Sequence, residues 1–132
     1  MDNLTSAKDW QRFAEMDLMS AEYLFKMSPV TVEIICYHFQ QSAEIYLKEY
    51  SIAWDESTKD SCLNQLLKLC VNISDRFLDI ADHCSGLTAY GVPPKYPMKL
   101  IQEERDMQDA IISAKAIRDF IFNIAPQMGQ ED

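Results

Sequence analysis

Apolar residues recur every three or four positions through most of the chain, which is the spacing of a helix with one buried face. The first such segment begins near Thr5 or Ser6, and its apolar stripe consists of Trp10, Phe13, Ala14, Ala21, Leu24 and Phe25. Asp17 falls in the middle of this stripe. Pro29 disfavours helical geometry at Ser28, so the helix is expected to end within the sequence MSPV.

The stretch EIICYHFQQSAEIYLKEY, residues 33–50, predicts a second helix with two partly apolar faces. One face carries the core stripe of Ile35, Phe39, Ala43, Tyr46 and Tyr50. The opposite face is mixed and holds Ile34, His38, Gln41 and Ile45, while Gln40, Glu44 and Lys48 form an i, i+4 series between the two. Such a helix is expected to be either central in its bundle or part of a subunit interface.

Three further helices are predicted along the rest of the chain. A polar connection, residues 51–61, precedes a short helix containing Leu63, Leu66, Leu67 and Cys70. A longer helix is expected from about Ser74 to Tyr90, and the prolines that follow it predict a stiff extended crossover. The last helix is expected from about Gln102 to Ile124, with Met107, Ala110, Ile111, Ala114, Ile117, Ile121 and Ile124 facing inward.

The pattern as a whole predicts an all-α fold, an up-and-down four-helix bundle with an additional short helix. Only 3 Gly and 5 Pro in 132 residues favour helices over the tight turns of a β protein. We expect one domain over residues 1–132, with its core between about 5 and 125. The apolar runs are too short and too charged to cross a bilayer, and the first residues do not form a secretory signal.

Charge and cysteine spacing narrow the classes of function. A net charge of −9 with scattered Lys and Arg argues against tight sequence-independent binding of nucleic acid, but it permits a small nucleotide or a basic protein partner. The four cysteines have no C-x-x-C pair and fall within apolar helical patterns, which favours reduced core thiols in a cytoplasmic protein over a metal or redox role. Neither His has a Glu three residues before it, so no di-iron site and no cofactor are expected.

The chain contains DWQRFAEMDLMSAEYL in its first predicted helix, CYHFQQSAEIYLKEY in its second and YGVPPKYP before its last. Together these three segments resemble the HEPN domain family, whose name stands for higher eukaryotes and prokaryotes nucleotide-binding. The family has an Asp-Leu pair in its first helix, a Gln-x-Ala-Glu-x-x-Leu-Lys run in its second and an Arg-Tyr-Pro turn before its last. The corresponding residues here are Asp17-Leu18, then Gln41-Ser42-Ala43-Glu44 with Leu47-Lys48, then Lys95-Tyr96-Pro97. The resemblance covers nearly the whole chain, and the run in the second helix is its most specific part.

The resemblance implies a helical bundle that commonly dimerises and, in many prokaryotic members, acts beside a minimal nucleotidyltransferase, often as a toxin–antitoxin pair. It also implies a nucleotide site, for which Lys48, Lys95 and Tyr96 are the candidates here. Lys95 replaces the family's Arg and lacks the planar fork that grips a phosphate. In the last helix Arg118 has no His after it, so the Arg–His pair of HEPN RNases cannot be placed there. The leading hypothesis is therefore a non-catalytic, dimeric HEPN subunit.

Two alternatives remain open. In the first, Arg76 and His83 act as an RNase pair: they have six residues between them, which matches the spacing of the HEPN RNase pair, and they share a helix face. Asp79 and Asp82 lie near His83 and favour a surface charge cluster instead. The second alternative is a helical protein-interaction scaffold without a ligand. The polar residues Asp17, His38, Gln41 and Glu44 are expected to form a network or interface that holds the fold or dimer together, since a carboxylate on a core stripe requires a partner.

Overall fold

The computed structural model describes residues 3–53, 62–88 and 104–126, and all regular elements in these ranges are helical. In chain order they are α1 (Asn3–Leu24), α2 (Val32–Ala53), α3 (Leu63–Ile73), the 3-10 helix η1 (Asp75–Ile80), α4 (Ala81–Thr88) and α5 (Glu104–Ile124). The described residues contain no strand, so the all-α fold class expected from the sequence is confirmed.

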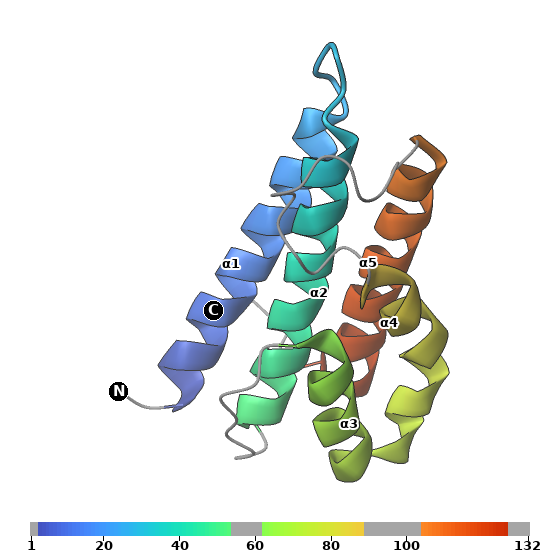
Figure 1. Ribbon diagram of the computed structural model, residues 1–132. Helices are drawn as coiled ribbons and strands as arrows, with labels where there is room; N and C mark the ends of the chain where they lie inside the picture. Colours follow the sequence, from blue (N-terminus) through green and yellow to red (C-terminus); the bar gives the residue numbers. More distant parts are fainter. Residues whose placement is uncertain (1–2, 54–61, 89–103, 127–132) are drawn as a thin grey trace.

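Helix α2 lies at the centre of the bundle (Figure 1). It packs against α1 on one side and against α5, α3 and α4 on the other. Of the two positions expected for a helix with two apolar faces, the central one is observed. Its core stripe is fully buried from Ile35 to Tyr46, and Tyr50 is nearly so.

Aromatic rings join α2 to the helices around it. The Tyr46 ring meets Phe122 of α5 at a centroid distance of 5.6 Å, and Tyr50 meets Phe77 of η1 at 4.7 Å. Phe77 in turn lies 5.0 Å from Phe120. These tilted and edge-to-face pairs hold α2, α5 and η1 at fixed relative positions.

The core stripe of α1 differs from the one expected. Ala14, Leu18 and Ala21 are buried, whereas Phe13 is 49% exposed. Two alanines let the backbones of α1 and α2 approach closely, and the buried face is therefore centred on small side chains. Phe13 lies about 100° around the helix from Ala14 and falls outside this narrow contact.

The helix expected from about Ser74 to Tyr90 is two elements within the described residues. Its first six residues form η1, and the α-helix begins only at Ala81. A 3-10 helix has three residues per turn, which places Phe77 and Ile80 on the same side, and both are buried. From there Ile80, Cys84 and Leu87 follow the α-helical spacing.

Some expected boundaries also change. α1 ends at Leu24, four residues before Ser28, and α2 continues to Ala53 into the expected polar connection. The proline-rich crossover and the expected start of the last helix at Gln102 lie outside the described residues. No helix in the described ranges is both long and apolar enough to span a membrane.

Candidate functional site

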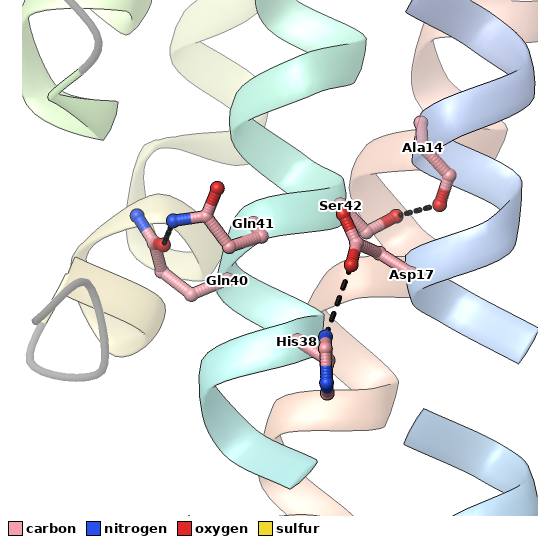
Figure 2. A network of polar contacts seen from close by, with 6 residues as sticks. All are labelled: Ala14, Asp17, His38, Gln40, Gln41 and Ser42. Atoms are coloured by element: carbon pink, nitrogen blue, oxygen red, sulfur yellow. Dashed lines mark hydrogen bonds and ion pairs between the residues drawn. The ribbon is translucent and has the colours of Figure 1, made fainter. Parts of the chain in front are cut away.

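Asp17 and His38 face each other across the contact between α1 and α2 (Figure 2). Asp17 Oδ1 lies 3.0 Å from His38 Nδ1, and both side chains are about one quarter exposed. An ionised carboxylate can only accept, so the His38 Nδ1–H is the donor in that state. Burial raises the pKa of Asp17 above its usual value, while the hydrogen bond and charge of His38 oppose that rise. The pair gives the carboxylate of the first helix a partner on the second.

Two other polar side chains of α2 make contacts near this pair (Figure 2). The buried Ser42 hydroxyl donates to the Ala14 carbonyl of α1 at 2.8 Å, which ties the two helices directly. The Gln41 amide donates to Gln40 Oε1 at 3.4 Å and so stays on its own helix. The polar contacts between α1 and α2 thus include Asp17, His38 and Ser42, whereas Gln41 points toward a different region.

That region is an open cleft between α1, α2 and α3. It has a volume of about 210 Å³ and is lined by Trp10, Gln41, Glu44, Ile45, Lys48 and Leu66. The Lys48 ammonium lies 4.9 Å from the centre of the Trp10 ring, a cation–π distance. Three of the residues singled out in the sequence, Gln41, Glu44 and Lys48, therefore line one cleft together with an aromatic ring that was assigned to the core.

The polar groups of the cleft are partly desolvated. Burial raises the pKa of Glu44 above its usual value, and a hydrogen bond from Gln40 and the charge of Lys48 act in the opposite direction. The cleft therefore offers an aromatic face, a cation, an amide and a carboxyl group within one small volume. A planar ring with a polar edge and a nearby anionic group is the ligand chemistry that such a set can accept.

The remaining candidates from the sequence lie elsewhere. Lys95 and Tyr96 are outside the described residues. His83 of α4 has its Nδ1 3.1 Å from the Ser113 hydroxyl of α5, while Arg76 of η1 is exposed. In the described ranges, no three His, Cys, Asp or Glu side chains are grouped closely enough to hold a metal ion.

The cysteines differ in their surroundings. Cys36, Cys70 and Cys84 are buried and free, and burial raises the pKa of each thiol to about 12. Thiols in this state pack as small apolar groups and are poor nucleophiles. Cys62 is exposed, in contrast to the core position expected for all four.

Glu49 of α2 was not singled out in the sequence, yet it is the most unusual ionisable group among the described residues. Only 1% of it is exposed, and neither its Oε1 nor the buried Tyr46 hydroxyl has a hydrogen-bond partner in the described part of the chain. Burial raises the pKa of Glu49 to about 8, with the like charge of Glu15 adding to the shift and a backbone hydrogen bond at Gln11 opposing it. The spacing Phe39–Ser42–Tyr46–Glu49 follows the helical repeat and was the available signal.

Comparison with known proteins gives one family and one fold. The sequence model of a family described as HEPN domain matches residues 7–124. The crystal structure of an archaeal HEPN homologue is similar to this chain with a TM-score of 0.69 and 24% sequence identity, over 92% of this chain and 97% of the homologue. At that identity the similarity shows the fold alone. No curated protein matches this chain.

Proposed function

Since this chain belongs to the HEPN domain family, we propose that it is a non-catalytic, dimeric subunit that binds a small nucleotide and acts with a minimal nucleotidyltransferase, as in toxin–antitoxin pairs. The observation that carries the nucleotide part is the cleft lined by Trp10 and Lys48. The dimer and the nucleotidyltransferase partner rest on the family.

The ligand would use the aromatic face and the cation of the cleft in different ways. A base stacked on an aromatic ring is worth about 1–3 kcal/mol, and every base can do so because each has a π face. Lys48 carries its ammonium on a flexible four-carbon stem, so it can leave the ring of Trp10 and follow a phosphate. Gln41 and Glu44 supply donors and acceptors for the edge of the base.

The size of the cleft limits what enters it. Its volume of about 210 Å³ is below the roughly 300 Å³ at which pockets for drug-sized ligands begin. We therefore place only the base in the cleft and the phosphates at its mouth. The net charge of −9 agrees with a small anion held by one or two cations rather than with a long polyanion.

Two features support the non-catalytic part of the proposal. Arg118 of α5 binds the neighbouring Asp119 through its Nε at 2.9 Å and has no His after it in the sequence. His83 is the other candidate for RNase chemistry, and its Nδ1 is engaged by the Ser113 hydroxyl at 3.1 Å. In the RNase alternative, purified protein would cleave RNA and the His83→Ala variant would not.

Thermal unfolding with a panel of nucleotides tests the binding part. A nucleotide at about a hundred times its dissociation constant stabilises by about 2.7 kcal/mol, which raises the midpoint by roughly 5 to 15 °C in a domain of this size. We expect one nucleotide to produce this shift and the Lys48→Ala variant to lose it. Lys68→Ala is the matched control, because Lys68 is exposed on α3 and does not line the cleft.

A shift that survives in Lys48→Ala would move the site away from the cleft, and Lys95→Ala would then test the turn that the family resemblance indicates. No shift with any nucleotide would overturn the binding proposal and leave an interaction scaffold. The partner part is tested separately by mixing the chain with a purified minimal nucleotidyltransferase. A complex that elutes ahead of both components on size exclusion supports this part, and separate elution contradicts it.

A further inference from the structure

Large apolar side chains gather on the outer face of α1. Phe13, Met16, Met19 and Tyr23 are between 49% and 71% exposed and follow one another at helical spacing. The described ranges contain eight exposed large hydrophobic residues, and these four are half of them. Two more, Met27 and Ile34, lie at the adjoining ends of α1 and α2. An exposed apolar surface of this extent on one side of a protein marks an interaction site.

The position of α1 leaves this face uncovered. α1 lies at the edge of the bundle, where it packs mainly on α2 through Ala14, Leu18 and Ala21 (Figure 1). At about 100° per residue, Met16 and Tyr23 lie on roughly the opposite side of the helix from that contact. The Trp10–Lys48 cleft opens on the side near α2 and α3, so the two surfaces are separate.

The order of side chains along this face is nearly the same when it is read backwards. From the amino end the residues are Asp9, Phe13, Met16, Met19, Tyr23 and Lys26, that is, acid, aromatic, methionine, methionine, aromatic, base. The Lys26 ammonium lies 5.6 Å from the centre of the Tyr23 ring, so its charge is at the end of the face. The three symmetric pairs have residue numbers that add to 35 or 36.

A second α1 that runs antiparallel across this face would therefore bring these six side chains into three kinds of complementary pair. Met16 lies opposite Met19 of the other copy, and Phe13 lies opposite Tyr23. Asp9 lies opposite Lys26 of the other copy, which pairs unlike charges at both ends. Asp9 and Lys26 are both exposed and form no ion pair with each other or with other described residues. A two-fold symmetric interface requires this kind of self-complementary surface.

We propose that a second copy of this chain docks on the outer face of α1, with the two α1 helices antiparallel about a two-fold axis that crosses this face between Met16 and Met19. This inference rests on the dimer of the proposed function and names its interface. The methionines supply flexible apolar contact at the centre, and the charges at the ends set direction and register more than affinity. An anionic membrane is a poor alternative, because the face has acid as well as base and the chain carries a net charge of −9.

Sedimentation of wild-type protein and variants at micromolar concentration tests the interface. We expect a wild-type dimer and a Met19→Glu monomer, because the two-fold axis brings two new carboxylates together in an apolar centre, and we expect the dissociation constant to rise at least tenfold. Ile112→Glu is the matched control, since Ile112 on α5 is 60% exposed but lies outside the face, and it should leave the dimer intact. Thermal midpoints close to wild type in both variants would show that folding is retained.

A charge exchange tests the antiparallel register. Asp9→Lys and Lys26→Asp should each weaken the dimer, because each places like charges opposite one another twice. The double variant should restore the wild-type dissociation constant. Failure of the double variant to recover would overturn the antiparallel register.

The outcomes separate this inference from the proposed function. A wild-type monomer at micromolar concentration would contradict both the dimer and this interface. A dimer that resists Met19→Glu would place the interface elsewhere and leave the dimer standing. A monomer that binds a nucleotidyltransferase through this face, with binding lost in Met19→Glu, would replace the second copy by that partner.

Discussion

At the scale of single residues, Glu49 is a carboxyl group enclosed between helices with an unsatisfied oxygen. Its pKa is about 8 in the folded chain against an ordinary value of 4.5, so the folded state holds the proton more tightly than the unfolded state. The stabilisation from this group is complete below about pH 4.5 and is lost as the pH rises through 8. At neutral pH the carboxyl is mostly protonated and neutral.

Replacement of Glu49 by Gln should remove this dependence. Each unit of pKa difference corresponds to about 1.4 kcal/mol, so the free energy of unfolding of Glu49→Gln relative to wild type should rise by a few kcal/mol between about pH 5 and pH 9. Urea unfolding across this range measures the difference. Glu33→Gln, which changes an exposed carboxyl on the same helix, is the control. If the free energies of unfolding of Glu49→Gln and wild type changed in parallel with pH, the raised pKa of Glu49 would be contradicted.

Sequence patterns were least informative about such individual side chains. The periodicity identified the stripe of α2. In α1, however, Phe13 was assigned to the buried stripe and is half-exposed, while Leu18 was not assigned to it and is buried, because the exposure of each depends on how closely α1 and α2 approach. The sequence also indicated that Asp17 requires a partner, and it grouped Asp17 with His38, Gln41 and Glu44 without deciding which of them pairs with it. Asp17 pairs with His38 because of how far α1 is shifted along its axis relative to α2. The spacing of residues within one helix does not give that shift.

At the scale of elements, the contact of α1 with α2 combines buried apolar residues with polar contacts, one of which comes from a buried hydroxyl. Ser42 donates across the contact to the Ala14 carbonyl at 2.8 Å. Ser51, buried on the same helix, donates at 2.9 Å to the Lys48 carbonyl of its own helix. Both serine hydroxyls thus donate to a backbone carbonyl, but only Ser42 joins two helices.

Substitution of the two serines by alanine separates these roles. Ser42→Ala should lower the free energy of unfolding by about 1 kcal/mol, because it removes an interhelical hydrogen bond in a buried contact. Ser51→Ala should change it by no more than a few tenths of a kcal/mol, because a serine that bonds back to its own helix competes with that helix. Denaturant titration gives both values. Equal effects would mean that the bond to Ala14 does not hold α1 in place.

The helical type and approximate positions of the elements could be predicted from the sequence, but the ends of α1 and α2 and the division of one expected helix into η1 and α4 could not. Apolar spacing identified four long or medium helices and a short one, and the family resemblance was confirmed. The 3-10 geometry of η1 was missed because Phe77 and Ile80, three residues apart, also fit an α-helical face. Phe77 packs against Tyr50 and Phe120, and the spacing within the segment does not reveal these contacts.

At the scale of the whole molecule, the net charge of −9 acts against the association of two copies. The proposed interface has an apolar centre and only two ion pairs at its ends. Repulsion between the two acidic chains should therefore dominate the response of the dimer to salt.

Raising the ionic strength should tighten the dimer. The screening length falls from about 30 Å at 0.01 M to about 8 Å at 0.15 M, which reduces repulsion between the chains more than it weakens contacts at short range. We expect the dissociation constant from sedimentation to fall severalfold over this interval. Weaker association at the higher ionic strength would show that the ion pairs of Asp9 and Lys26 dominate the interface.

The methionines on the outer face of α1 also make this surface chemically labile. Met16, Met19 and Met27 are 51%, 68% and 46% exposed, whereas Met107 in the core is 4% exposed. Hydrogen peroxide converts an accessible methionine into a polar sulfoxide. In a limited treatment of protein diluted below the dissociation constant of the dimer, followed by peptide mass mapping, the three exposed methionines should react first and Met107 last, and equal rates would contradict the burial of Met107.

In the dimer, Met16 and Met19 should be shielded from peroxide, so the rate at which they react should fall as protein concentration rises. Once oxidised, they would place polar sulfoxides at the centre of an apolar contact. The monomer that reacts would then stay a monomer until a reductase restored the thioether. Association of this chain is thus expected to respond to oxidants through methionine, while its three buried cysteines remain inert.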